Sequence, residues 1–368
     1  METPPKFTPA ERIEAIRRRP GMYVGGIDGG GLRHMLWEVV ANAIDEHIAG
    51  RCSRIVIEIA PDGSISVEDN GRGMPLKEID GIPFAQMALT TFHQTPTLDG
   101  HAPHEHIDGF GIGLFPVCAL SAWLEYRVSH EGRFISQRFE RGVAVSGLRD
   151  EGPSDATGTR IVFAPDPTIF PPMADSGPIL ARLREMSYFL PKLTFHFTDR
   201  REHILHEPRG IVAHVDAAAS RRAGSANQPT FAAAGTIGQI IVEAAARWFP
   251  AGVPDIESYA NIHRTTAGGT HAHGLLLGLI AGLKQAAPKA CTHHSPKRLE
   301  RAISRGLVAI VCVRLNDPHY ESPTKNRLIT PAAKAAVRKC IAPAFRDFLK
   351  TERPLLDHLL STLNSKTI

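Results

Sequence analysis

Long hydrophobic runs are scarce in this chain of 368 residues, and the longest, GLLLGLIAGL at 274–283, is too short to cross a bilayer. The N-terminal segment, METPPKFTPAERIEAIRRRP, lacks the apolar core of a signal peptide. These absences argue against a membrane span and against secretion. We therefore expect a protein that stays in the cytoplasm and makes no contact with a membrane.

Cysteine is scarce as well, and its five positions are odd in number, scattered and set among apolar residues. This favours buried free thiols over a disulfide framework, and we expect no disulfides. HAPHEH at 101–106 and CTHH at 291–294 hold metal-capable side chains but have no matching second half, so zinc is not favoured. No spacing supports a Ser/His/Asp nucleophile.

The net charge of +4 is modest but unevenly placed. From Lys284 to the C-terminus there are 16 Lys/Arg against 6 Asp/Glu, a balance of +10, which leaves 4 − 10 = −6 for the preceding part. A basic region of this kind attracts a polyanion such as duplex DNA through its phosphates. Solvated helix faces would give the same count, so both interpretations stay open.

The chain is longer than one ordinary core needs, and its periodicities predict an α+β protein of two domains. Residues 1–212 combine an amphipathic helix, a hairpin, Gly-rich loops and further strands. Polar and small residues then predict a linker over 213–232. Residues 233–368 form a second α/β unit, with a helix around THAHGLLLGLIAGLKQAA and a strand at GLVAIVCVRL.

The segment LWEVVANAIDEHIAGRC at 36–52 predicts an amphipathic helix, because its apolar residues recur at helical spacing. Glu38, Asn42 and Asp45 share the other face, so a carboxylate and an amide point together toward whatever lies beside the helix. For an isolated helix, a solvated face is the simpler interpretation of these residues.

Two glycine-rich loops follow the helix. VEDNGRGMP at 67–75 places Asp69 at a strand end, where it could accept a hydrogen bond from an exocyclic amine, although a plain turn is the simpler interpretation. DGFGIG at 108–113 precedes a helix, and such a loop can cradle phosphate with its backbone N–H groups. Each loop alone is weak support for a nucleotide site.

Together, RRRPGMYVGG, LWEVVANAIDE, VEDNGRGMP, DGFGIG and TGTRIVF resemble, in order and spacing, the ATP-binding domain of the GHKL superfamily. DNA gyrase B, the E-type subunit of topoisomerase IV, MutL, heat-shock chaperones and sensor histidine kinases share this domain. Among these proteins the resemblance is closest to gyrase B, and the Arg-Pro-Gly-Met-Tyr motif at 19–23 is typical of type II topoisomerases and not of the chaperones or kinases. YANIHRTTAGGTHAHGLLLGL and GLVAIVCVRLNDPHYESPTKNRL resemble the topoisomerase transducer domain.

The resemblance implies a GHKL (Bergerat) ATP-binding α/β sandwich followed by a transducer domain of ribosomal-protein-S5-like type. It implies ATP and Mg²⁺ as ligands, Glu38 as the general base, Asn42 as the metal ligand, and Lys325 of PTK reaching the γ-phosphate. Glu46 and Arg72 are expected to pair. The remaining nucleotide-binding residues that it implies are Asp45, Asp69 for the adenine amine, Arg72, Gly73, Met74, Thr159 and the phosphate-wrapping Gly109, Gly111 and Gly113.

The chain departs from the family at several of these positions. Ala41 stands where the family usually has an Asp, Pro323 where it has a Gln, and Asp108 where it has a glycine. No metal-binding TOPRIM domain with its Glu-Gly-Asp-Ser-Ala motif follows the transducer region, so we expect no DNA cleavage by this chain alone.

We therefore expect an ATP-hydrolysing subunit of a type II topoisomerase system. It would form a homodimer on binding ATP, handle duplex DNA and work with a separate DNA-cleaving subunit or domain. The alternative is an ATP-gated interaction module with little or no turnover.

Overall fold

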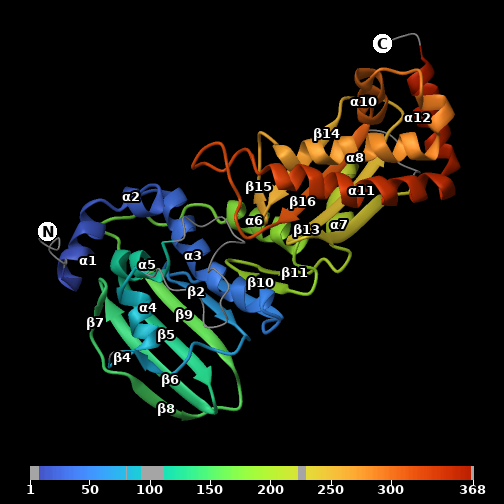
Figure 1. The fold of residues 1–368 in the computed structure, drawn as a ribbon. Helices are drawn as coiled ribbons and strands as arrows, with labels where there is room; N and C mark the ends of the chain where they lie inside the picture. The colour runs from blue at the N-terminus through green and yellow to red at the C-terminus, as the bar shows by residue number, and fades with distance from the viewer. Residues whose placement is uncertain (1–7, 80, 93–111, 223–228, 366–368) are drawn as a thin grey trace, which may run out of the picture. The chain divides into compact units, whose positions relative to one another are not determined.

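The structure is a computed structural model that describes residues 8–79, 81–92, 112–222 and 229–365. The chain divides into two compact units, Met1–Glu207 and Pro208–Ile368, and each has its own sheet (Figure 1). In the described part of the chain, no helix has the length and apolar character needed to cross a membrane. The five cysteines are free thiols, four of them buried.

The first unit is built on a nine-stranded sheet in the order β11-β10-β1-β2-β9-β5-β6-β7, with β8 paired to β6. Strands β1 and β10 run parallel and the other pairs are antiparallel. The strands are β1 (Arg54–Ile59), β2 (Ile65–Asp69), β5 (Ser121–His130), β6 (Arg133–Glu140), β7 (Val143–Ala144), β8 (Arg149–Pro153), β9 (Gly158–Pro165), β10 (Thr194–Thr198) and β11 (Glu202–Leu205). A separate small hairpin joins β3 (Glu78–Ile79) to β4 (Ile82–Pro83).

Helices form a second layer against this sheet (Figure 1). They are α1 (Pro9–Arg18), α2 (Gly21–Val24), α3 (Gly29–Ile48), α4 (Phe84–Thr90), α5 (Leu114–Leu120) and α6 (Gly177–Ser187). Helix α3 packs on β2 and β9, and α5 packs on β5, β6 and β9. The helix and the hairpin predicted from periodicity are therefore present as α3 and β1–β2.

Helix α3 begins where Asp28 accepts hydrogen bonds from the N–H groups of Gly30 and Gly31, which satisfies two free donors of the first turn. It ends before Gly50, whose φ of +76° suits a glycine just beyond a helix. Its apolar stripe faces the sheet and is buried, as the spacing of those residues predicts. The stripe thus fixes which face of α3 presents its polar residues.

The second unit contains a five-stranded sheet in the order β12-β13-β16-β14-β15, in which only β14 and β16 run parallel. Its strands are β12 (Phe231–Ile237), β13 (Ile240–Trp248), β14 (Asp255–Ala260), β15 (His263–Arg264) and β16 (Leu307–Arg314). Its helices are α7 (Ile211–Ser220), α8 (Thr270–Ala286), α9 (Pro288–Cys291), α10 (Pro296–Ser304), α11 (Pro331–Thr351) and α12 (Arg353–Asn364).

The apolar run at 274–283 lies inside α8, which packs closely along α11. Gly274, Gly278 and Gly282 form the contact face: a Cβ added at Gly278 would lie 2.8 Å from the Cβ of Ile341. These glycines let the two helix backbones approach, so the run serves helix packing within the unit.

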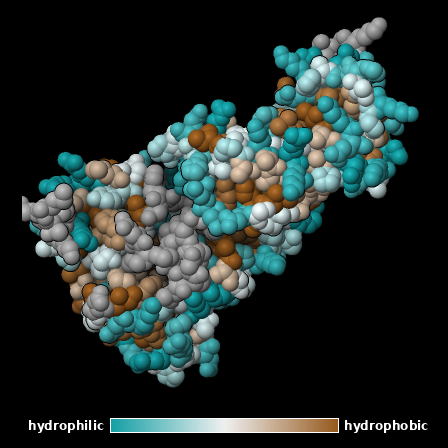
Figure 2. Space-filling model, in the orientation of Figure 1, coloured by the Kyte–Doolittle hydropathy of each residue, from teal (hydrophilic) through white to brown (hydrophobic). Residues whose placement is uncertain are grey.

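Basic side chains stay on the outside of this unit. On the face drawn in Figure 2, hydrophilic residues predominate where α10 and α12 lie. The exposed cations from residue 284 onward within the described chain are Lys284, Lys289, Lys297, Arg301, Arg305, Arg327, Lys334, Arg338, Lys339, Lys350 and Arg353.

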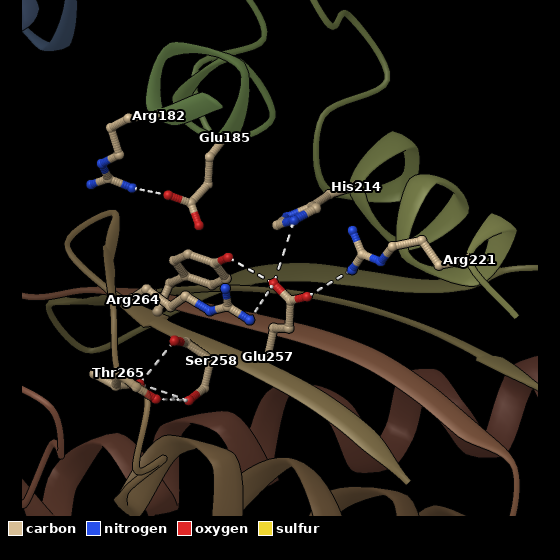
Figure 3. A network of polar contacts seen from close by, with 9 residues as sticks. Arg182, Glu185, His214, Arg221, Glu257, Ser258, Arg264 and Thr265 are labelled. Atoms are coloured by element: carbon tan, nitrogen blue, oxygen red, sulfur yellow. Dashed lines mark hydrogen bonds and ion pairs between the residues drawn. The ribbon is translucent and has the colours of Figure 1, made fainter. Parts of the chain in front are cut away.

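The linker predicted over 213–232 is wrong for its first part, because residues 211–220 form α7 and pack on β13 and β16. Two ion-pair networks hold this region to the sheet. Asp216 accepts from Arg209 at 2.8 Å and from Arg247 at 3.1 Å. In Figure 3, His214 and Arg221 converge on the buried Glu257 of β14, whose carboxylate also contacts Arg264.

Candidate active site

The carboxylate of Glu38 is the centre of the polar face of α3 and is completely buried, with 0% exposed. Its Oε1 lies 3.3 Å from Nε2 of His34, one helical turn earlier. Its Oε2 accepts a hydrogen bond of 3.0 Å from the backbone N–H of Gly113, immediately before α5. One oxygen of this buried carboxylate accepts a hydrogen bond and the other lies against the His34 imidazole, which restricts its orientation as a general base requires.

Asn42 lies one turn further along α3, where its Nδ2 donates a hydrogen bond of 2.9 Å to the carbonyl oxygen of Glu38. This bond fixes the amide so that Oδ1 is the atom left to bind a ligand. Asp45 follows on the same helix and is buried. The structure therefore brings the three predicted residues of this helix face into one row.

Asp69 ends β2 with 9% of its surface exposed, and its Oδ1 accepts a hydrogen bond of 2.7 Å from the N–H of Gly71. Burial raises the pKa of this carboxyl to about 7, and the neighbouring Glu46 acts in the same direction. The backbone of Thr159, at the start of β9, also hydrogen-bonds to it. Asp69 and Thr159, predicted to act together, are thus neighbours.

The loop after Asp69 is held to α3 by the predicted pair of Glu46 and Arg72. The backbone N–H of Arg72 donates to Oε2 of Glu46 at 3.3 Å, and its Nε lies 3.2 Å from Oε1. Gly73 follows with φ of +80°, and a Cβ there would lie 2.5 Å from the carbonyl oxygen of Ser129. Only glycine fits this position without displacing the backbone.

The remaining predicted residues are Met74, Lys325 of the second unit, and three glycines of which two lie outside the described chain. Met74 is half-buried at the end of the loop. Gly109 and Gly111 lie outside the described residues, so of the three predicted phosphate-binding glycines only Gly113 has a described position. Lys325 belongs to the second unit, in a turn with φ of +55° closed by its N–H to the carbonyl of Ser322.

No three His, Cys, Asp or Glu side chains in the described ranges are grouped so that they could hold a metal ion. The CTHH cluster at 291–294 lies within those ranges, and the HAPHEH segment at 101–106 lies outside them. The weak zinc hypothesis therefore gains no support.

Two family profiles match the chain. The profile described as "Histidine kinase-, DNA gyrase B-, and HSP90-like ATPase" matches residues 27–169, and "DNA gyrase B" matches residues 210–367. The structure of the 43K ATPase domain of Thermus thermophilus gyrase B, in complex with an aminocoumarin, superposes with a TM-score of 0.83 at 31% identity. That match covers 95% of this chain and 93% of that one. This chain belongs to the DNA gyrase B family.

Two curated members of the family show how much of a full-length relative this chain covers. The DNA gyrase B protein of Halalkalibacterium halodurans is 34% identical over 92% of this chain and 55% of its own length. The DNA topoisomerase 4 B protein of Streptococcus pneumoniae is 33% identical over 95% and 56%. The chain thus spans about half the length of these relatives. The expected fold, a GHKL ATPase domain followed by the gyrase B transducer domain, is confirmed.

One residue of this gyrase B-type site was missed by the sequence analysis. His34 precedes Glu38 by one helical turn and contacts its carboxylate. The four-residue spacing on a predicted helix was a usable signal, because such residues are neighbours on the helix surface.

Proposed function

We propose that this chain binds ATP and hydrolyses it to ADP and phosphate, as the ATPase part of a type II topoisomerase system. The observation that carries the proposal is the buried Glu38 carboxylate, with the His34 imidazole 3.3 Å from one oxygen and the N–H of Gly113 donating a hydrogen bond to the other. A water placed beside this carboxylate would lose its proton to Glu38 as its oxygen attacks the γ-phosphorus and the bond to ADP breaks.

The adenine would lie at the Asp69 loop. Because Oδ1 of Asp69 already accepts from Gly71, its Oδ2 is the oxygen that would accept from the adenine amine. Gly73 would leave room for the base, with Thr159 and Met74 beside it. Asp45 and Arg72 would complete the nucleotide-binding wall from α3 and the loop.

Asn42 is the residue that would hold Mg²⁺, since its remaining amide oxygen is a neutral oxygen ligand of the type this ion takes beside phosphates. The bound ion would neutralise charge on the phosphates. Gly109, Gly111 and Gly113 would wrap the phosphates with their N–H groups. Lys325 of the second unit would contact the γ-phosphate.

Dimerisation on ATP binding, duplex DNA binding and cooperation with a DNA-cleaving subunit or domain belong to the same proposal. The support for DNA binding is the set of exposed cations from residue 284 onward. Their contacts would be to phosphate, so binding would be salt-sensitive and indifferent to sequence.

A second candidate, an ATP-gated interaction module with little turnover, is favoured by Ala41. This residue precedes Asn42 and is fully buried, so α3 supplies no carboxylate at that position. Both candidates bind ATP, and they differ in the rate of phosphate release.

Glu38→Ala tests the proposed base. We expect the dissociation constant for ATP to stay within about threefold of the parent value, because the residue acts on the water, and hydrolysis to fall by about 10² or more. Glu58→Gln, on the exposed side of β1, is the control and should match the parent. Hydrolysis by Glu38→Ala above about a tenth of the parent rate would refute the assignment.

A further inference from the structure

The backbone of Arg72 is held on both sides of its Cα. Its N–H donates to Glu46 of α3, and its carbonyl oxygen lies 2.6 Å from Nδ1 of His130, the last residue of β5. Both backbone polar groups of one loop residue are therefore bound to side chains from different elements.

The chemistry of this contact fixes the role of the imidazole. A carbonyl oxygen can only accept a hydrogen bond, so Nδ1 of His130 carries the proton and donates. The other ring nitrogen, Nε2, lies 3.5 Å from the exposed carboxylate of Glu131. The side chain of His130 is 18% exposed, so water competes little for the Nδ1 bond.

The bond lies where the loop touches the sheet most closely. Gly73, the residue after the bonded carbonyl, packs against the carbonyl of Ser129 in β5, and Gly158 at the start of β9 packs against the carbonyl of Asp69. A Cβ at Gly158 would come within 2.0 Å of that oxygen. The path from Asp69 to Gly73 thus lies directly on the ends of β5 and β9.

We propose that His130 is a positioning residue for the base-binding side of the nucleotide site, where its Nδ1–H holds the Arg72 carbonyl and so fixes the loop that carries Asp69. The inference rests on the proposed function, in which Asp69 reads the adenine amine. Without this bond the Arg72–Gly73 peptide could rotate, because glycine allows many backbone conformations. The loop from Asp69 to Gly73 would then be less ordered before the nucleotide binds.

The test uses three substitutions in the full chain. In His130→Asn the amide nitrogen occupies the place of Nδ1, whereas in His130→Gln it occupies the place of Nε2. His130→Ala removes the donor altogether. With a non-hydrolysable ATP analogue, we expect the dissociation constant to rise about fivefold for Ala and Gln and to stay within about twofold for Asn, one hydrogen bond being worth about a factor of five.

Two further measurements separate positioning from general damage. At saturating ATP, the turnover number should stay within about twofold in all three variants, because Glu38 and its partners are untouched. Without nucleotide, hydrogen exchange of residues 70–76 should be faster in Ala and Gln than in Asn and the parent.

His130→Asn behaving like His130→Gln, or turnover falling in step with affinity, would overturn the proposal. Unchanged hydrogen exchange in His130→Ala would show that His130 does not hold the loop, whatever the chain binds. Failure of the parent to bind ATP would instead overturn the proposed function, and the exchange data would still decide whether His130 holds the loop.

Discussion

Replacing Asp69 by Asn should make the protein more stable and a poorer ATP binder at the same time. Burial raises the pKa of the Asp69 carboxyl from 3.8 to about 7, so the folded state keeps its proton over a pH range in which the unfolded chain has lost it. Between about pH 4 and pH 7 the folded state therefore binds more protons, and the free energy of unfolding falls as the pH rises. Asparagine does not titrate, so the free energy of unfolding of the variant does not fall in this pH range for that reason.

The size of the effect follows from the two pKa values. At about 1.4 kcal/mol for each pH unit, the difference between 3.8 and about 7 amounts to about 4 kcal/mol above pH 7, as an upper value. The stability of Asp69→Asn minus that of the parent should grow from about pH 4 to pH 7 and then level off. Calorimetric melting between pH 5 and 8, following the transition that ATP shifts in the parent, measures this difference.

Loss of ATP binding has a separate cause. If the Asn oxygen keeps the hydrogen bond from Gly71, its NH₂ group faces the adenine amine, and two donors oppose each other. We expect ATP affinity to fall by about tenfold or more. A stability difference independent of pH would refute the assigned pKa, and unchanged ATP affinity would remove the adenine contact.

Asp62→Asn provides a control in which the change of stability with pH has the opposite sign. Asp62 accepts hydrogen bonds from the N–H and hydroxyl of Ser64, which lower the pKa of its carboxyl. It therefore adds stability above its unfolded pKa that is lost as the pH falls. Its substitution should weaken the protein slightly at neutral pH and leave ATP binding unchanged.

Three further predictions concern glycines and the second unit. Gly73→Ala should abolish ATP binding and destabilise the first unit in calorimetric melting. Gly63→Ala, with φ of +84° but open space around it, should lower the free energy of unfolding by only about 1 to 2 kcal/mol. Equal losses of stability in the two variants would contradict the close packing at Gly73. Gly278→Ala should lower the melting temperature of the second unit, and an unchanged value would mean that α8 and α11 separate without cost. Lys325→Ala should weaken binding of a non-hydrolysable ATP analogue but not of ADP in equilibrium titrations; equal weakening of both would exclude a γ-phosphate contact.

The local part of the site could be predicted from the sequence, because one helix and one hairpin carry it. The spacing of apolar residues fixes the face of α3 that presents Glu38 and Asn42, and β2 ends at Asp69 as its alternation predicts. The Gly-rich loop then follows directly. Such features depend on periods of a few residues and on backbone conformations that only glycine adopts readily.

The contacts that complete the site could not be predicted from spacing, since they join distant parts of the chain. His130 reaches Arg72 across 58 residues, and Gly113 reaches Glu38 across 75. Helix α7 was mistaken for linker because its small residues lack a clear apolar stripe. It is held by packing on β13 and β16 and by contacts of His214 and Arg221 with Glu257, far along the chain.

Steady-state phosphate release from the unaltered chain at saturating Mg-ATP measures whether the Glu38 centre turns ATP over. We expect release of many phosphates per chain, at a rate that falls to the buffer background in Glu38→Ala. Tight binding of ATP with no more than one phosphate released per chain would contradict it and would favour the ATP-gated interaction module.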